Sequence, residues 1–93
     1  MKRTEREILN DFIKLGWMVV YNDCYIGIKF RKFSEMLDSS KSSICIYDTV
    51  LEISKLNHWY SCYVYNESTK LSVPIDMQEH QLLHELFICW GWL

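Results

Sequence analysis

The sequence predicts an α+β fold: one antiparallel sheet of about five strands, flanked by an N-terminal and a C-terminal helix. Near each end of the chain a capping box precedes apolar residues at helical spacing, over residues 4–16 and 76–91. Between these helices, segments rich in β-branched and aromatic residues alternate with short polar stretches, which is typical of hairpins. A length of 93 residues is that of one domain, so we assign residues 1–93 to a single domain.

The composition favours a soluble, cytoplasmic protein. Apolar residues make up 49% of the chain, which argues against disorder, and no apolar run approaches the ~20 residues that a membrane span requires. The charged segment Met1–Glu7 is not followed by an apolar signal-peptide stretch. A net charge of −2, with both signs mixed along the chain, argues against a strongly basic nucleic-acid binder and against an acidic DNA mimic.

The use of small residues hints at the origin of the chain. It contains no alanine, three glycines and one proline. Because all three residue types use GC-rich codons, the composition indicates an AT-rich genome, and small chains of this kind are common in bacteriophages and other mobile elements. We therefore expect a phage or a mobile element to encode the protein.

The first helix is predicted from signals at both of its ends. Thr4 and Glu7 form a capping box, in which the Thr hydroxyl accepts from the amide of the third helical residue and the Glu side chain reaches back. Gly16 is placed to end the helix in a left-handed conformation. The apolar face consists of Ile8, Leu9, Phe12 and Ile13.

A first hairpin is predicted with strands at residues 17–21 and 24–30 around the two-residue turn Asn22-Asp23. In this register the core-facing pairs are Tyr21 with Cys24, Val19 with Ile26, and Trp17 with Ile28. The opposite face carries Met18, Val20, Tyr25, Gly27 and Lys29. The polar, serine-rich segment 33–43 then predicts a mobile loop, or a loop with one helical turn from Ser34.

A second hairpin is predicted with strands at residues 44–54 and 59–65 around the turn 55–58. Its self-consistent register pairs Ser54 with Trp59, Ile53 with Tyr60, Leu51 with Cys62, and Thr49 with Val64. The alternation changes phase in the first part of this hairpin, so we expect a bulge or break near Asp48. A short strand at residues 70–73 follows.

The second hairpin carries a row of three large rings. Because alternate residues of a strand point to opposite faces, Trp59, Tyr63 and Tyr65 share the face opposite Tyr60, Cys62 and Val64. Tyr60, Cys62 and Val64 can therefore pack in a hydrophobic core. The rings of Trp59, Tyr63 and Tyr65 would then contact a second layer of the structure or a partner.

The last helix repeats the signals of the first. Asp76 and Glu79 form a capping box, and Gly91 supplies the stop that lets Trp92 fold back onto the last turn. The apolar stripe consists of Leu82, Leu83, Leu86, Phe87 and Trp90. If both helices dock on the same face of the sheet, the row of rings stays open on the other face.

Two side-chain groups raise the question of metal binding or redox chemistry. His80 and His84 stand four residues apart on the last helix, which is how helices present zinc ligands, but the zincin pattern needs a Glu where Gln81 stands. We interpret both histidines as solvated or facing a partner, with no metal. The cysteines Cys24, Cys45, Cys62 and Cys89 are widely spaced, which favours buried thiols that act as small apolar groups.

We expect neither catalysis nor a cofactor. The carboxylates are scattered, and no nucleophile-elbow or Cys/His signature is present. Three glycines are too few for a phosphate-cradling loop.

One basic cluster offers an alternative function. Residues 29–33 interleave Lys29, Arg31 and Lys32 with two phenylalanines. Next to the rings on an open sheet, such cations are how single-stranded nucleic acids are held. Solvated charges at the end of a strand are the simpler interpretation.

The leading hypothesis is a small non-enzymatic protein that binds another protein, as an inhibitor or adaptor directed at a host or defence protein. Open aromatic patches on small proteins usually mark interaction sites. The candidate contacts are Trp59, Tyr63, Tyr65, Tyr25, Lys29 and Arg31 on the sheet, with Met77, His80, His84 and Ile88 on the last helix as a second surface. A homodimer through either surface and a single-stranded nucleic-acid binder are the alternatives.

Overall fold

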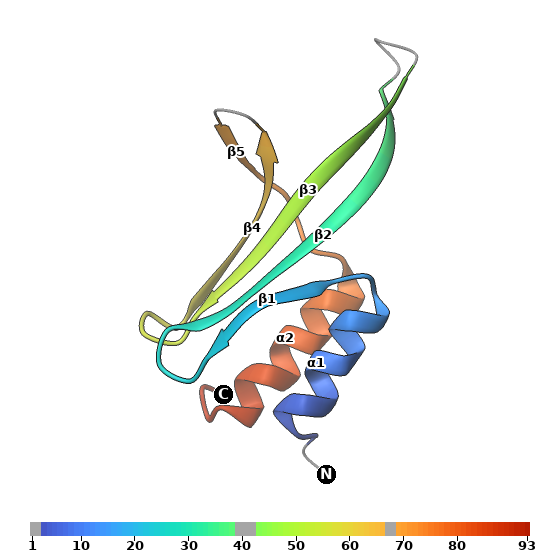
Figure 1. The fold of residues 1–93 in the computed structure, drawn as a ribbon. Coiled ribbons are helices and arrows are strands. Elements are labelled where there is room, and N and C mark those ends of the chain that lie inside the picture. Colours follow the sequence, from blue (N-terminus) through green and yellow to red (C-terminus); the bar gives the residue numbers. More distant parts are fainter. Residues whose placement is uncertain (1–2, 39–42, 67–68) are drawn as a thin grey trace.

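The computed structural model describes residues 3–38, 43–66 and 69–93, with the backbone path alone for 34–38, 43–47, 65–66 and 69–71. Its elements are, in chain order, α1 (Glu5–Lys14), β1 (Met18–Asp23), β2 (Gly27–Asp38), β3 (Ser43–Ser54), β4 (Trp59–Asn66), β5 (Thr69–Ser72) and α2 (Met77–Cys89). One antiparallel sheet has the order β1-β2-β3-β4-β5, in which β1 to β4 each have six or more residues and the four-residue β5 extends one edge. The predicted α+β fold, with a helix at each end of the chain, is confirmed (Figure 1).

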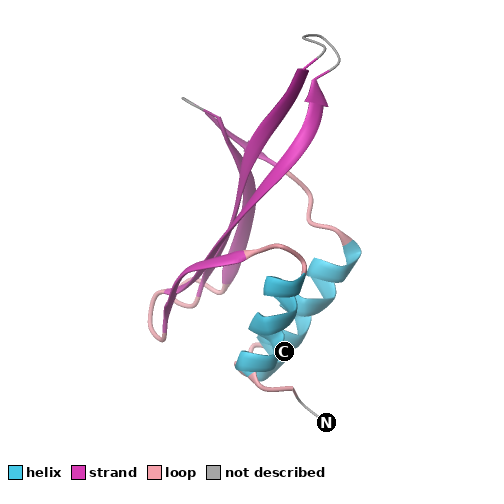
Figure 2. Cartoon of the chain, turned by 45° about the vertical axis from the view of Figure 1, so that its right-hand side comes forward, coloured by secondary structure: helices cyan, strands magenta, loops and turns pink. Residues whose placement is uncertain are grey.

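Both helices lie side by side beneath one face of the sheet (Figure 1, Figure 2). The hairpin of β2 and β3 reaches well past them, so the helices cover only part of that face (Figure 1). Within the residues that the structure describes, no helix lies on the opposite face. The molecule is elongated as a result, with principal extents of 47 × 25 × 19 Å.

The hydrophobic core lies between the helices and the covered face. Phe12 of α1 stacks on Phe30 of β2 with ring centroids 4.6 Å apart, and Trp17 meets Phe30 edge-on at 6.4 Å. Each fully buried apolar side chain contributes about 1.5–3 kcal/mol. The buried cluster comprises Ile8, Phe12, Trp17, Ile28, Phe30, Leu51, Ile53, Cys62, Leu82, Leu83 and Leu86. The predicted helix stripes are confirmed except at Ile13, which is half exposed.

The two helices begin and end alike. Each has the predicted capping box, with Thr4 and Asp76 as N-caps. Each ends in the pattern Phe-Ile-x-x-Gly-Trp, at residues 12–17 and 87–92. Gly16 and Gly91 adopt positive φ angles of 99° and 79°, as predicted. The amide after each glycine then donates to the carbonyl of the phenylalanine five residues earlier, the Schellman pattern that satisfies the last carbonyls of a helix.

The predicted register of the first hairpin is wrong. The turn contains Cys24, Tyr25 and Ile26, and both the Tyr25 and Ile26 amides donate to the Asp23 carboxylate at 2.8 Å. β1 therefore pairs Tyr21 with Lys29, and a bulge lies between Val19 and Tyr21. Of the six residues predicted to build core, Trp17 and Ile28 are buried, whereas Tyr21, Cys24, Val19 and Ile26 are exposed. The side-chain hydrogen bonds of an Asx-type turn decided the loop length here, and they outweighed the alternation pattern.

The loop predicted at 33–43 is also wrong over most of its length. Residues 33–38 continue β2 and residue 43 begins β3, with uninterrupted pairing from Gly27–Ser54 to Asp38–Ser43. No register shift occurs at Asp48, and no helical turn begins at Ser34. Residues 39–42 lie outside the described part of the chain. Long-range strand pairing here overrides the local preference of a serine-rich sequence.

The second hairpin agrees with its prediction pair for pair. Ser54 faces Trp59, Ile53 faces Tyr60, Leu51 faces Cys62, and Thr49 faces Val64. His58 closes the turn with a left-handed φ of 54°. β5 begins and ends one residue earlier than predicted.

Gly27 is required by close approach of two strands. Its φ is 141°, and a Cβ atom there would lie 1.8 Å from the Ile53 carbonyl oxygen of β3. Gly91 shares a positive φ, but a Cβ atom there would meet nothing within 4 Å. Substituting alanine at each of the two glycines therefore separates the free-energy cost of a backbone clash from the free-energy cost of an unfavourable φ.

We expect Gly27→Ala to lower the free energy of unfolding by clearly more than Gly91→Ala. The φ cost alone is about 1–3 kcal/mol at either position. At Gly27 the collision with backbone adds to that cost, because β3 cannot move without losing its pairs. Urea unfolding of both variants measures the difference. Equal losses would show that β2 and β3 are not so close at this point.

Glu79 is a buried carboxylate between α2 and the sheet. It is 7% exposed, and its side chain accepts from the Asp76 amide at 3.3 Å as the second half of the capping box. Burial, more than any other cause, raises the pKa of Glu79 above its ordinary value. The folded state therefore holds the Glu79 proton more tightly than the unfolded chain does.

This pKa shift gives a pH dependence of stability with a definite sign. The contribution of Glu79 is fully present below its ordinary pKa of about 4.3 and is lost as pH rises through the raised value. Glu79→Gln removes the titration. We therefore expect the free energy of unfolding of the wild type, minus that of the variant, to fall from about pH 4 to pH 7. A difference that stays constant or rises with pH would contradict the shift.

Candidate interaction surface

The open face of the sheet holds most of the sheet residues that were predicted to contact a partner, but several of them are buried or paired with carboxylates. The strand pairing places Trp59, Tyr63, Lys29 and Arg31 on this face, opposite the helices. Trp59 is 45% exposed, whereas Tyr63 is only 6% exposed. The Tyr63 hydroxyl donates to Glu52 at 2.7 Å, so this ring lies across the sheet and is not a free contact. Tyr65 belongs to β4, and its side chain lies outside the described part.

The cations of the open face are paired with carboxylates. Arg31 donates from Nε to Asp48 at 3.2 Å and from Nη2 to the second carboxylate oxygen, and this fork raises the pKa of Arg31. Lys29 lies 3.7 Å from Glu52. The face is thus a set of neutral pairs, and it is not a track of free positive charge.

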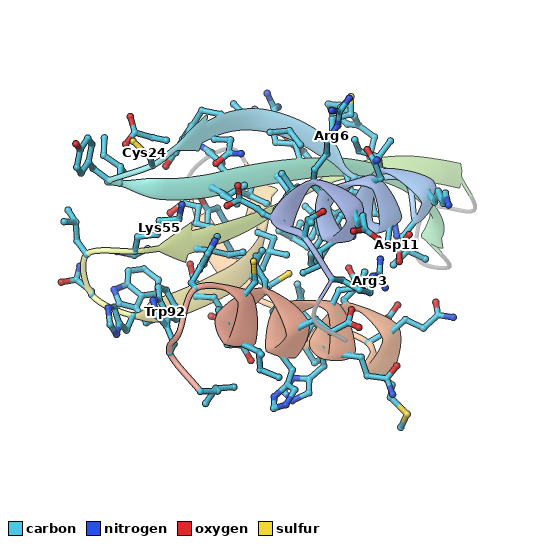
Figure 3. The ribbon with its side chains drawn as sticks, turned by 90° about the horizontal axis from the view of Figure 1, so that it is seen from below. Arg3, Arg6, Asp11, Cys24, Lys55 and Trp92 are labelled. Atoms are coloured by element: carbon cyan, nitrogen blue, oxygen red, sulfur yellow. The ribbon has the colours of Figure 1, made fainter. Side chains whose placement is uncertain are left out.

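Tyr25 lies elsewhere than predicted. It occupies the tip of the β1–β2 turn and is 78% exposed. This turn is joined to the β3–β4 turn by a hydrogen bond of 2.9 Å from the Lys55 amide to the Ile26 carbonyl. Figure 3 shows Cys24, Lys55 and Trp92 at this same end of the molecule.

The two joined turns expose a group of apolar side chains. Leu56 is 72% exposed, Ile26 is 54% exposed, and Trp59 begins the strand that leaves the second turn. We call Tyr25, Ile26, Leu56 and Trp59 the turn-end surface. Large apolar residues that gather at one exposed end are the usual mark of an interaction site.

A cluster of stacked rings supports the turn-end surface from below. Trp92 stacks on His58 at 4.3 Å and on Phe87 at 4.9 Å, and Tyr60 lies 6.1 Å from Phe87. Trp90 adjoins Trp92 at 5.1 Å. The β3–β4 turn is therefore packed directly on the C-terminal end of α2. The sequence indicated that Trp92 folds back, but not that it meets His58, because that contact joins residues far apart in the chain.

A polar contact anchors the same turn to α1. Lys55 lies 3.5 Å from the Glu5 carboxylate and 4.4 Å above the Trp90 ring. The Trp90 indole N–H donates to the same Glu5 oxygen at 2.9 Å. These three residues tie the start of α1, the β3–β4 turn and the end of α2 together, so the turn-end surface is held in place before any partner arrives.

The second predicted surface lies on α2. Met77 is 79% exposed, His80 and His84 are exposed, and Ile88 is half-buried. Both histidines also line a groove of about 600 Å³ between α1 and α2. Arg3 bridges the two helices across this groove, since its guanidinium contacts Asp11 of α1 and lies 3.3 Å from Glu85 of α2. Among the described residues, no three metal-binding side chains converge there or elsewhere.

The cysteines have different surroundings. Cys62 is buried in the core, and burial raises the pKa of its thiol to about 11, so it acts as a small apolar group as predicted. Cys89 is half-buried. Cys24 is exposed in the β1–β2 turn, and for this residue the prediction of burial is wrong. The side chain of Cys45 lies outside the described part.

Comparison with known proteins gives no relative: no family model, curated protein or solved structure matches this chain. Within the described residues, neither helix has the length and apolar character needed to cross a membrane.

We expect Trp92→Ala to lower the free energy of unfolding by about 2 kcal/mol, because it removes two ring stacks and their buried area. It should also speed amide hydrogen exchange at residues 55–58, which lose their support. Trp59→Ala is the matched control and should cost about 1 kcal/mol or less, because Trp59 is half exposed. Equal losses, or unchanged exchange in the turn, would contradict the supporting role of Trp92.

Proposed function

We propose that this chain is a small non-enzymatic protein that acts as an inhibitor or adaptor by binding another protein through the turn-end surface. The observation that carries the proposal is the placement of Tyr25, Ile26, Leu56 and Trp59 in or next to two turns that are joined to each other, of which the β3–β4 turn is packed on the C-terminal end of α2. Core demand does not explain these side chains, because each is 45% exposed or more.

The chemistry of the surface describes its partner. Trp and Tyr present a flat apolar ring with a polar edge, and such residues dominate the energetics of protein interfaces. A complementary protein offers an apolar pocket that accepts these rings, with hydrogen-bond acceptors at its rim. Because the turns are held by the Glu5, Lys55 and Trp90 contacts and by the stack of His58 on Trp92, little conformational entropy is lost on binding.

A single-stranded nucleic acid is the alternative ligand, and it gains no support from the open face. The predicted stacking ring Tyr63 is buried, and the predicted phosphate contacts Lys29 and Arg31 already face carboxylates. Phosphate binding would first have to break both pairs.

The test begins with capture of partners from a lysate of the cell of origin by the immobilised wild type, with and without nuclease. The captured protein is then purified, and its dissociation constant is measured against three forms of the chain. These are the wild type, a Tyr25→Ser/Trp59→Ser variant of the turn-end surface, and a Met77→Ser variant of α2 as the matched control.

We expect the turn-end variant to bind about 10-fold or more weakly, and the Met77 variant to bind as the wild type does. Circular dichroism confirms that each variant is folded. Equal binding by wild type and turn-end variant would move the interface elsewhere. Recovery of nucleic acid that nuclease abolishes would replace the proposal with the alternative.

A further inference from the structure

The first turn of α2 is held on the sheet by one buried side chain, and that side chain is an acid. Within residues 76–81, Glu79 is buried and every other residue is exposed. Further along, α2 is docked by the buried side chains of Leu82, Leu83 and Leu86. The three leucines can keep the rest of α2 in place, whereas the docking of its first turn depends on Glu79.

The groups around Glu79 include no paired cation. The Asp76 amide donates to Glu79 Oε1 at 3.3 Å, and the Glu79 amide donates to the Asp76 carboxylate at 2.8 Å. On the side of the sheet, Glu79 faces the Trp17 indole and the Cys62 thiol of β4. Lys32 of β2 lies beyond this pair, 5.5 Å from the centre of the Trp17 ring. Within the described residues, neither Asp76 nor Glu79 takes part in an ion pair.

Two buried polar atoms at this contact have no hydrogen-bond partner among the described residues. They are Oε2 of Glu79 and Nε1 of Trp17. Burial is the largest cause that raises the pKa of Glu79, and the carboxylate of Asp76 adds to it. Together they outweigh the Asp76 amide and the Trp17 indole, which favour the ionised form. The contact therefore tolerates a protonated Glu79 and is destabilised by an ionised one, because a buried charge without a cation is costly.

The capping box of α1 offers a comparison within the same chain. Its N-cap is Thr4, a hydroxyl where α2 has a second carboxylate. Its Glu7 is exposed, although it holds the same helical position as Glu79. Glu7 is therefore an acid with the same capping role and no burial.

We propose that the first turn of α2 is a pH-sensitive contact, which lies on the sheet while Glu79 carries a proton and moves away when Glu79 ionises. Hydration of the released carboxylate drives the movement, and a negative charge remains favourable at the beginning of a helix. Solvent then reaches the Cys62 thiol beneath. The movement stays within residues 74–81, because the Val73 amide donates to the Cys62 carbonyl at 3.0 Å on one side and the leucines hold α2 on the other. This inference uses residues outside the turn-end surface, and it does not depend on the proposed function.

The test is the rate at which a pyridyl disulfide reagent modifies Cys62, measured from pH 4 to pH 7 in the wild type and in Glu79→Gln. Peptide mapping distinguishes Cys62 from the other cysteines. The ratio of the two rates at each pH removes the ordinary pH dependence of thiol reactivity. We expect the ratio of wild type to variant to rise about threefold or more over this range, since the wild type opens as Glu79 ionises and the variant cannot.

A purely electrostatic effect of Glu79 has the opposite sign. A negative charge near Cys62 disfavours the thiolate, so without any movement the ratio would fall as pH rises. Glu7→Gln is the matched control, and its ratio to the wild type should stay constant with pH. A ratio for Glu79→Gln that is flat or falls, or an equal change in Glu7→Gln, overturns the proposal.

Amide hydrogen exchange in the wild type alone covers the case in which Glu79→Gln fails to fold. The His80 amide, which donates to the Asp76 carbonyl at 2.9 Å, should lose protection as pH rises from 4 to 7, after correction for the intrinsic exchange rate. Amides of Val50 to Ile53 in the central strand β3 should keep theirs. Unchanged protection at His80 overturns the proposal. So does a parallel loss in β3, which would show that the whole fold opens.

Discussion

The packing of both helices on one face of the sheet is the constraint on which the rest of the structure depends. Phe12 of α1 and Leu86 of α2, both fully buried, meet the same side of β2 and β3. A chain of 93 residues has too little apolar surface to build a second such layer. The opposite face must therefore be satisfied within the sheet, and it is: Arg31 pairs with Asp48, and Tyr63 lies across the strands to reach Glu52.

The same constraint decides which apolar residues stay outside. The helices lie antiparallel beneath the sheet, so α2 ends at the two joined turns through its Gly-Trp turn, whereas α1 starts near them and ends at the opposite end, before β1 (Figure 1). Trp17 enters the core, whereas Trp92 packs on His58 and supports the β3–β4 turn. Apolar side chains that extend past this support at the turn end have no helix to cover them. This is the surface that we propose to function in binding.

The sequence predicted what local chemistry determines and missed what distant contacts determine. Both capping boxes and both glycine stops were correct because each depends on residues a few positions apart, and every pair proposed for the second hairpin was correct because one short turn at residues 55–58 sets the register of the strands on either side of it. The first hairpin failed because the Asp23 side chain selects a three-residue turn at residues 24–26, which shifts the strand pairing, and because the bulge between Val19 and Tyr21 turns Tyr21 to the open face. The length of β2 and β3 could not be read from serine-rich residues, since it follows from mutual pairing. For the site, Trp59 and Tyr25 were correctly expected to be exposed, but the ring stack beneath them joins residues over thirty positions apart.

The most direct measurement of the central claim is photo-crosslinking in the cell of origin. A photoreactive phenylalanine analogue replaces Leu56, which is 72% exposed at the turn end, and in a parallel sample it replaces Met77 on α2. The account predicts one discrete crosslinked protein from position 56 and none of that protein from position 77. Crosslinks to that protein from position 77 alone, or crosslinks to nucleic acid from position 56, would contradict it.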